Sequence, residues 1–197
     1  MPGKMRDADL AATARHVVRS IASASTSRSN INPAWRPRLS QPLSVYGFSC
    51  WTYSIAGILV LAQSLVCPTA FLPDWANVAR KEGCALVLQG CWSFCSDVLN
   101  VGRPSRFHSI DRVSALMLTC IQIFKFGIIA PYAIRLDQLL WGWLSIVVGL
   151  SCKLMGSRAI LADCVEDFYF WHCMWHLTLP VGLVAIPTAA WLGHDAC

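Results

Sequence analysis

The sequence predicts an all-α protein, a polytopic transmembrane helical bundle of about five spans. Of its 197 residues, 55% are hydrophobic and only 14% are charged, whereas globular domains carry roughly 25% charged residues. Several apolar runs also approach or exceed the roughly 20 residues that a membrane-crossing helix needs. The expected spans are Val45–Val66, Cys84–Leu99, Ile110–Phe124, Leu136–Cys152 and Phe168–Leu192.

The first span is the clearest, because Val45–Val66 contains no formal charge over 22 residues. It also starts too far from the N-terminus to be a standard signal-peptide core. Prolines, glycines and charges indicate the connections. Cys67–Gly83 is expected to be a loop with two prolines and a charged cluster, and Asn100–His108 a turn broken by Gly102 and Pro104.

Charge divides the chain into two parts, residues 1–44 and residues 45–197. The first part holds seven Lys or Arg and two Asp, which is the whole net charge of +5, while the second holds nine basic and nine acidic residues. A neutral body has no basic face that could follow phosphates, so nucleic acid is not an expected partner. We expect residues 1–44 to be a basic, disordered N-terminal arm and residues 45–197 to be the transmembrane helical domain.

Two interpretations of the arm stay open. Leu10–Ile21 could form a short basic amphipathic helix, as in an organelle transit peptide. Asp7 and Asp9 favour instead a cytosolic tail that orients the first span, because transit peptides contain few acidic residues.

The positions of the basic residues also predict an orientation. If the arm is inside, the next inside loops are Asn100–His108 and Lys153–Asp163, and each carries two basic side chains near the ends of spans. The outside loops are close to neutral, in agreement with the positive-inside tendency. An integral protein of an endomembrane is the expected location.

The ten cysteines do not indicate a disulfide framework, since most lie inside apolar runs where a thiol behaves as a small hydrophobic group. Cys91 and Cys95 are one helical turn apart, but a structural zinc site needs more ligands than these two.

Polar side chains inside the expected spans indicate a site, because Asp and His are costly in hydrocarbon. Ser93 and Asp97 are four residues apart on one helix face, Asp111 begins the third span, and His172 and His176 are four apart near the start of the fifth. In the predicted topology all these groups lie at the same membrane depth. Trp171 and Trp175 could instead belong to an interfacial aromatic belt, but the convergence favours the site.

Two imidazoles and one carboxylate are a typical ligand set of a catalytic zinc ion, which keeps a further position for water. We therefore expect Asp97, His172 and His176 to bind zinc, or another divalent metal. Asp111 would orient or deprotonate the water, and Ser93 would stabilise an oxyanion.

At these residues the chain resembles the CREST superfamily of membrane hydrolases, which includes alkaline ceramidases, progestin/adiponectin receptors and lipases that remodel GPI anchors. The family pattern is Ser followed four residues later by His, then Asp at the start of the next helix, then H-x-x-x-H in the last. Ser93–Asp97, Asp111–Ala115 and His172–His176 are similar to these three elements. The run Trp175–Pro180 is closest to the GPI-remodelling branch. The similarity covers three short blocks within residues 84–182.

The resemblance implies zinc held by three side chains and hydrolysis of a lipid amide or ester. The chain departs from the family in two ways. Asp97 stands where the family has a His ligand, for which His108 is a possible substitute, and this could weaken zinc or favour another metal. The segment from Asp111 to His172 has room for two helices instead of four, so that seven spans become five.

Three functions remain as hypotheses. The first is a metal-dependent membrane hydrolase whose partners are the bilayer and a lipid substrate. The second is a non-catalytic, receptor-like or scaffold protein of the same fold, suggested by Asp97 and the missing helix pair. The third is a proton or metal-ion transporter, placed last because the internal repeats common in transporters are absent from the sequence. Oligomeric state leaves no signature in the sequence.

Overall fold

The computed structural model describes residues 31–66, 73–129 and 136–182, and every regular element in these ranges is helical. The main helices are α3 (Val45–Cys50), α4 (Thr52–Val66), α5 (Pro73–Phe94), α6 (Arg106–Phe124), α7 (Leu136–Leu161) and α8 (Val165–Pro180). Two π-helical segments, η4 (Cys95–Leu99) and η5 (Lys125–Ile129), follow α5 and α6 directly. Two short helices, η2 (Pro33–Trp35) and α2 (Arg36–Leu39), precede α3. The all-α prediction is confirmed.

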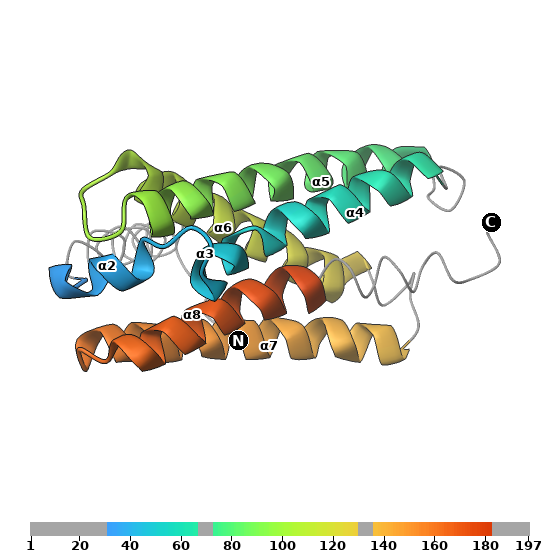
Figure 1. Cartoon of the computed structure of the whole chain (residues 1–197). Coiled ribbons are helices and arrows are strands. Elements are labelled where there is room, and N and C mark those ends of the chain that lie inside the picture. Colours follow the sequence, from blue (N-terminus) through green and yellow to red (C-terminus); the bar gives the residue numbers. More distant parts are fainter. Residues whose placement is uncertain (1–30, 67–72, 130–135, 183–197) are drawn as a thin grey trace, which may run out of the picture.

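Two antiparallel helix pairs form the bundle, α4 with α5 and α7 with α8. Figure 1 shows the two pairs on opposite sides of the molecule, with α3 and α6 between them. Small residues permit the close approach of α4 and α5. A Cβ atom built on Gly57 would lie 2.5 Å from the carbonyl oxygen of Gly83, and Ser54 donates a hydrogen bond to the carbonyl oxygen of Val87. Close packing through small residues is typical of helices in membranes.

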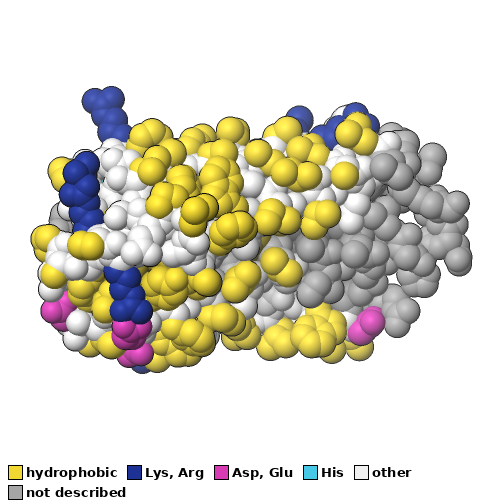
Figure 2. Space-filling model, viewed as in Figure 1, with side chains coloured by type: hydrophobic (Ala, Val, Ile, Leu, Met, Phe, Trp, Pro, Cys, Tyr) yellow, Lys and Arg dark blue, Asp and Glu magenta, His cyan; other side chains and the backbone are white. Residues whose placement is uncertain are grey.

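Within the described residues, two stretches are long and apolar enough to cross a membrane, Val45–Leu65 and Leu139–Leu161. Large hydrophobic side chains are exposed along α6 and α7, and Figure 2 shows hydrophobic side chains over much of one face of the bundle. The structure thus supports two of the five expected spans and does not confirm the full number. The remaining long helices each carry several charges, such as Arg80–Glu82 in α5.

Helix boundaries differ from the predictions at three of the connections. Residues 106–108, expected in a turn, form the start of α6 after the N-cap Ser105. Residues 73–83, expected in a loop, form the first turns of α5, because proline at the first helical position favours a helix start. Residues 153–161, also expected in a loop, extend α7 to Leu161, and only three residues separate it from α8. Proline is absent from this stretch, and its single glycine, Gly156, lies against α8 beside Trp171. The expected Leu10–Ile21 helix lies outside the described residues, as does the end of the fifth span after residue 182.

Residues 31–44, which we call the N-terminal cap, were expected to be part of a disordered arm but are folded. Ile31, Trp35 and Leu39 are buried in a cluster with residues of η4, α7 and α8. The Trp35 and Phe168 ring centroids are 5.8 Å apart. Charge and proline content predicted disorder, whereas three apolar side chains at four-residue spacing anchor the segment.

Polar contacts attach the cap to the start of α8. The Asn32 amide donates to both carboxylate oxygens of Asp163 at 3.2 Å, and Arg38 forms an ion pair with Glu166. The Arg38 hydrogen bond is the main reason that the pKa of the Glu166 carboxyl lies below its usual value, and the same contact raises the pKa of Arg38.

Gly57→Ala should destabilise the bundle, because the added methyl group meets the Gly83 carbonyl oxygen. Overpacking of this kind costs about 1–3 kcal/mol, and thermal unfolding in detergent should show a lower Tm. Gly127→Ala is the control, since its Cβ would find its nearest neighbour, Trp143, at 3.8 Å. Equal effects of the two substitutions would contradict the proposed packing.

The Arg38–Glu166 pair should make cap docking dependent on pH. Because the folded-state pKa of Glu166 is lowered, its contribution is present above the unfolded-state pKa and is lost as pH falls through the folded-state value. The rate of proteolysis near residue 38 should therefore rise in acid for the wild type, below about pH 4. The Glu166→Gln variant should lack this component of the pH dependence, while Asp167→Asn, one residue further along α8, should retain it.

Candidate metal centre

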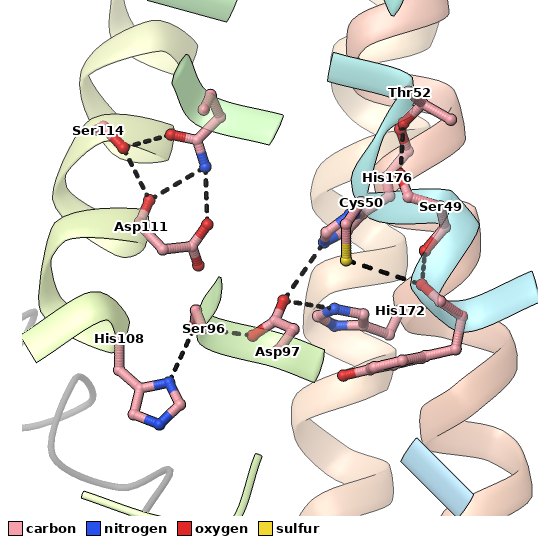
Figure 3. Close-up of polar contacts among 12 residues, drawn as sticks. Ser49, Cys50, Thr52, Ser96, Asp97, His108, Asp111, Ser114, His172 and His176 are labelled. Carbon is pink, nitrogen blue, oxygen red and sulfur yellow. Dashed lines mark hydrogen bonds and ion pairs between the residues drawn. The ribbon is translucent and has the colours of Figure 1, made fainter. Parts of the chain in front are cut away.

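Helix α8 positions the two histidines of the H-x-x-x-H motif. Glu166 and Asp167 lie in its first turn, where carboxylates favour the positive end of the helix dipole. His172 and His176 follow one turn apart on the buried face, and their ring centroids are 4.4 Å apart. Both imidazoles therefore point toward the same part of the bundle interior, as Figure 3 shows.

Asp97 reaches the same place from the π-helical segment η4. Its Oδ2 atom lies 2.9 Å from Nε2 of His172 and 3.7 Å from Nε2 of His176. The wider turn of a π-helix changes the direction of the side chains it carries, and such segments occur frequently at functional sites. The predicted convergence of Asp97, His172 and His176 is present in the structure.

These three residues form a buried group that could hold a metal ion, and we call them the metal centre. Each offers one ligand atom, and the three atoms lie within 4.8 Å of one another. A tetrahedral zinc ion with bonds of about 2.0–2.1 Å places its ligand atoms about 3.3 Å apart. The observed separations of 2.9 and 3.7 Å lie on either side of this value, and two imidazoles with one carboxylate suit zinc.

Aromatic rings from α3, α4 and α8 enclose the metal centre. Tyr46 stacks on His172 with centroids 5.0 Å apart, Phe168 lies 5.1 Å from the same ring, and Tyr53 meets His176 edge-on at 5.4 Å. The exposed fractions of Asp97, His172 and His176 are 3%, 4% and 2%. This environment has a low dielectric constant, which strengthens the attraction between the carboxylate and a cation.

A second layer of hydrogen bonds orients Asp97. Ser96 Oγ donates to Asp97 Oδ1 at 3.0 Å, and the same hydroxyl lies 2.8 Å from Nδ1 of His108. His108 Nε2 faces the carbonyl oxygens of Asn100 and Arg103 at 3.2 and 2.8 Å, so this nitrogen acts as a donor. Because the single hydrogen of the Ser96 hydroxyl goes to Asp97, Nδ1 of His108 can bond to Ser96 only as a donor. His108 thus supports Asp97 through Ser96 and does not belong to the metal centre, contrary to its suggested use as a substitute ligand. Outer partners of this kind affect metal affinity.

The two predicted catalytic residues lie outside this group of three but are buried. Asp111 Oδ1 accepts a hydrogen bond from the Gln89 amide at 2.8 Å, and Figure 3 shows the Asp111 carboxylate on the side of α6 toward Asp97. Ser93 is buried on α5 and interacts with the thiol of Cys50. Their catalytic roles remain predictions.

Several residues that contact the site were not identified from the sequence. Ser96 and Gln89 have no distinctive signal, because uncharged polar residues are common in helices. One signal was available, since Gln89, Ser93 and Asp97 repeat at four-residue spacing. The stacking of Tyr46 on His172 has no local signal, since 126 positions separate the two residues in the sequence.

Comparisons with protein-family models, with curated proteins and with solved structures give no match.

His176→Ala should remove stoichiometric metal from the purified protein, because two ligands alone hold zinc weakly. Mass spectrometry of metal content after equilibration with zinc measures the loss. His108→Ala is the matched control and should keep its metal, with an affinity lowered at most about 10–100-fold, as for other outer-layer partners. Metal loss in the His108 variant together with retention in the His176 variant would refute the assigned ligand set.

Proposed function

We propose that this protein is an integral-membrane, metal-dependent hydrolase that acts on a lipid amide or ester. The observation that carries the proposal is the buried group of two imidazoles and one carboxylate. Catalytic zinc sites use three protein ligands of these types and leave one position for water or substrate. The resemblance to the CREST superfamily points to the same reaction class.

The proposal includes five spans in an endomembrane, with the metal centre near the inner face. Four arginines lie at the same end of the bundle as the metal centre (Figure 1): Arg36 and Arg38 in the cap, Arg103 in the turn and Arg106 at the start of α6. Basic residues favour the inner side of a membrane. A reacting group at this depth is adjacent to the headgroup region, where the amide and ester linkages of lipids lie.

Each residue of the site would have its own role in the hydrolysis. Asp97, His172 and His176 would hold the metal, which when bound supplies a Lewis acid that polarises a carbonyl and makes water acidic near neutral pH. Asp111, held by Gln89, would accept the proton of the attacking water. The Ser93 hydroxyl would donate a hydrogen bond to the carbonyl oxygen as that oxygen gains negative charge.

A non-catalytic receptor-like or scaffold protein is the second candidate. The burial of all three ligands supports it, because water and substrate need access to a catalytic metal whereas a structural metal needs none. Metal binding alone therefore does not distinguish the two functions, and a measurement of turnover is required.

The decisive experiment measures fatty-acid release together with metal content. Purified protein loaded with zinc is incubated with a ceramide and with an ester phospholipid in mixed micelles, and released fatty acid is quantified by mass spectrometry. Asp111→Asn should keep full metal and lose about 10²–10⁴ in rate, the contribution of a positioned acid–base group. Asp97→His, which restores the family ligand, should keep both metal and activity.

Each result separates the candidates. Full metal without release from either lipid would favour the scaffold, and absence of metal from the wild type would refute the hydrolase. Asp167→Asn is the control for loss of one carboxylate, because Asp167 is exposed in the first turn of α8.

A further inference from the structure

A line of buried polar side chains runs between α5 and α6, outside the metal centre. On α5, Glu82, Gln89 and Ser93 lie on one face, seven and four residues apart. On α6, polar residues recur from one end of the helix to the other and reach the first residue of η5. We call this set the seam; its members on α6 and η5 are Asp111, Ser114, Thr119, Gln122 and Lys125.

Hydrogen bonds cross the seam at two levels. Near the metal centre, the Gln89 amide donates to Asp111 Oδ1 at 2.8 Å and accepts from the Ser114 hydroxyl. At the other level, Lys125 Nζ lies 2.8 Å from Glu82 Oε2, and the Gln122 amide donates to Glu82 Oε1. Glu82 and Gln122 are both buried.

The seam is long enough to cross most of the hydrocarbon core of a bilayer. Glu82 and Asp97 are 15 positions apart, which corresponds to about 22 Å at the helical rise of 1.5 Å per residue. The hydrocarbon core of a bilayer is about 30 Å thick. The Glu82–Lys125 level therefore lies toward the membrane face opposite the metal centre, and the Lys125 side chain is 20% exposed there.

The seam differs from the opposite face of α6, where most exposed residues are apolar, among them Val113, Met117 and Phe124. Polar groups are costly in an apolar interior, so a row of them is not explained by packing. One seam atom also lacks a partner among the described residues. The carbonyl oxygen Oε1 of Gln122 is buried and accepts no hydrogen bond, and water commonly satisfies buried polar atoms of this kind.

The metal centre, in turn, requires access for water if the proposed hydrolysis takes place. The cap and the rings of Tyr46 and Phe168 cover it from its own end of the bundle. The outer faces of α6 and α7 are mostly apolar, and their exposed charged residues lie near the helix ends. The seam is the polar connection that leads to Asp111 from the opposite end.

We propose that the seam is a water-filled path that supplies water to the metal centre from the membrane face at Glu82 and Lys125. The ligand of this site is water, bound at Gln122 and Glu82 and again at Ser114 and Asp111. Between these two levels lies Thr119, which is buried and donates to the carbonyl oxygen of Ala115, while Leu86 and Leu118 belong to the apolar core. The biological use of the path rests on the proposed hydrolase function, whereas the path itself is measurable without metal or substrate.

Cysteine labelling tests the path in lipid nanodiscs of phosphatidylcholine. A positively charged, membrane-impermeant methanethiosulfonate reagent reacts with thiolates, which form in water and not in hydrocarbon. Thr119→Cys is nearly isosteric and should be labelled at least about tenfold faster than Ile123→Cys on the apolar face of α6, by the same desolvation argument. Peptide mass spectrometry reads each site separately, so that the native, outward-facing Cys120 is an internal reference.

A second substitution tests the direction of access. Gln122→Leu replaces the unpartnered carbonyl by an apolar group and should slow labelling of Thr119→Cys about tenfold, because the path then loses its polar lining at that level. Labelling of Cys120 and the circular dichroism spectrum should not change. Equal rates at positions 119 and 123, or no effect of Gln122→Leu, would overturn the proposal.

Metal content is measured on the same preparations. Labelling at position 119 with no metal bound would support the path and refute the proposed function. Full metal and lipid hydrolysis without labelling would refute the path and leave the function standing.

Discussion

The contact between Asp97 and the two imidazoles of α8 connects the two halves of the bundle. Asp97 follows α5, and His172 and His176 belong to the α7–α8 pair, so their interaction joins the two helix pairs at one end. A buried carboxylate without a partner would be strongly destabilising. The sequence therefore has to bring a proton donor or a cation to this point, and the surrounding elements are arranged accordingly. Tyr46 and Phe168 pack on the His172 ring, and Ser96 holds the second carboxylate oxygen.

This arrangement also explains how two His and one Asp can work together as a ligand set. A carboxylate has two oxygens, and here they have different partners. Oδ2 faces the imidazoles while Oδ1 accepts from Ser96, which in turn contacts His108. An imidazole in place of Asp97 would leave only its second ring nitrogen for Ser96. Ser96 and His108 are thus the natural companions of a carboxylate ligand.

The sequence predicted the helical class and the three members of the metal centre, because both depend on local patterns. Apolar runs indicate helices, and the spacing of His172 and His176, with Asp97 on another helix, indicates convergence once the topology is assumed.

Helix limits were less predictable. Pro73 and the charges Arg80–Glu82 resembled a loop, although proline starts the helix and the charges lie within it. The N-terminal cap depends on Trp35 reaching Phe168, a contact over 133 positions that no local pattern records. The Glu82–Lys125 pair likewise joins residues from two helices whose relative rotation is set only by packing.

The cap has a consequence for the order of events during synthesis. Its polar partners, Asp163 and Glu166, are 131 and 128 positions further along the chain than Asn32 and Arg38. Residues 31–44 are therefore made early but cannot dock until the last described helix exists. The histidines of the metal centre lie on that same helix, so none of the site can assemble before α8 is present. Contacts between such distant segments form slowly compared with local helices. Assembly of the three ligand residues and covering by the cap thus belong to the same final stage of folding.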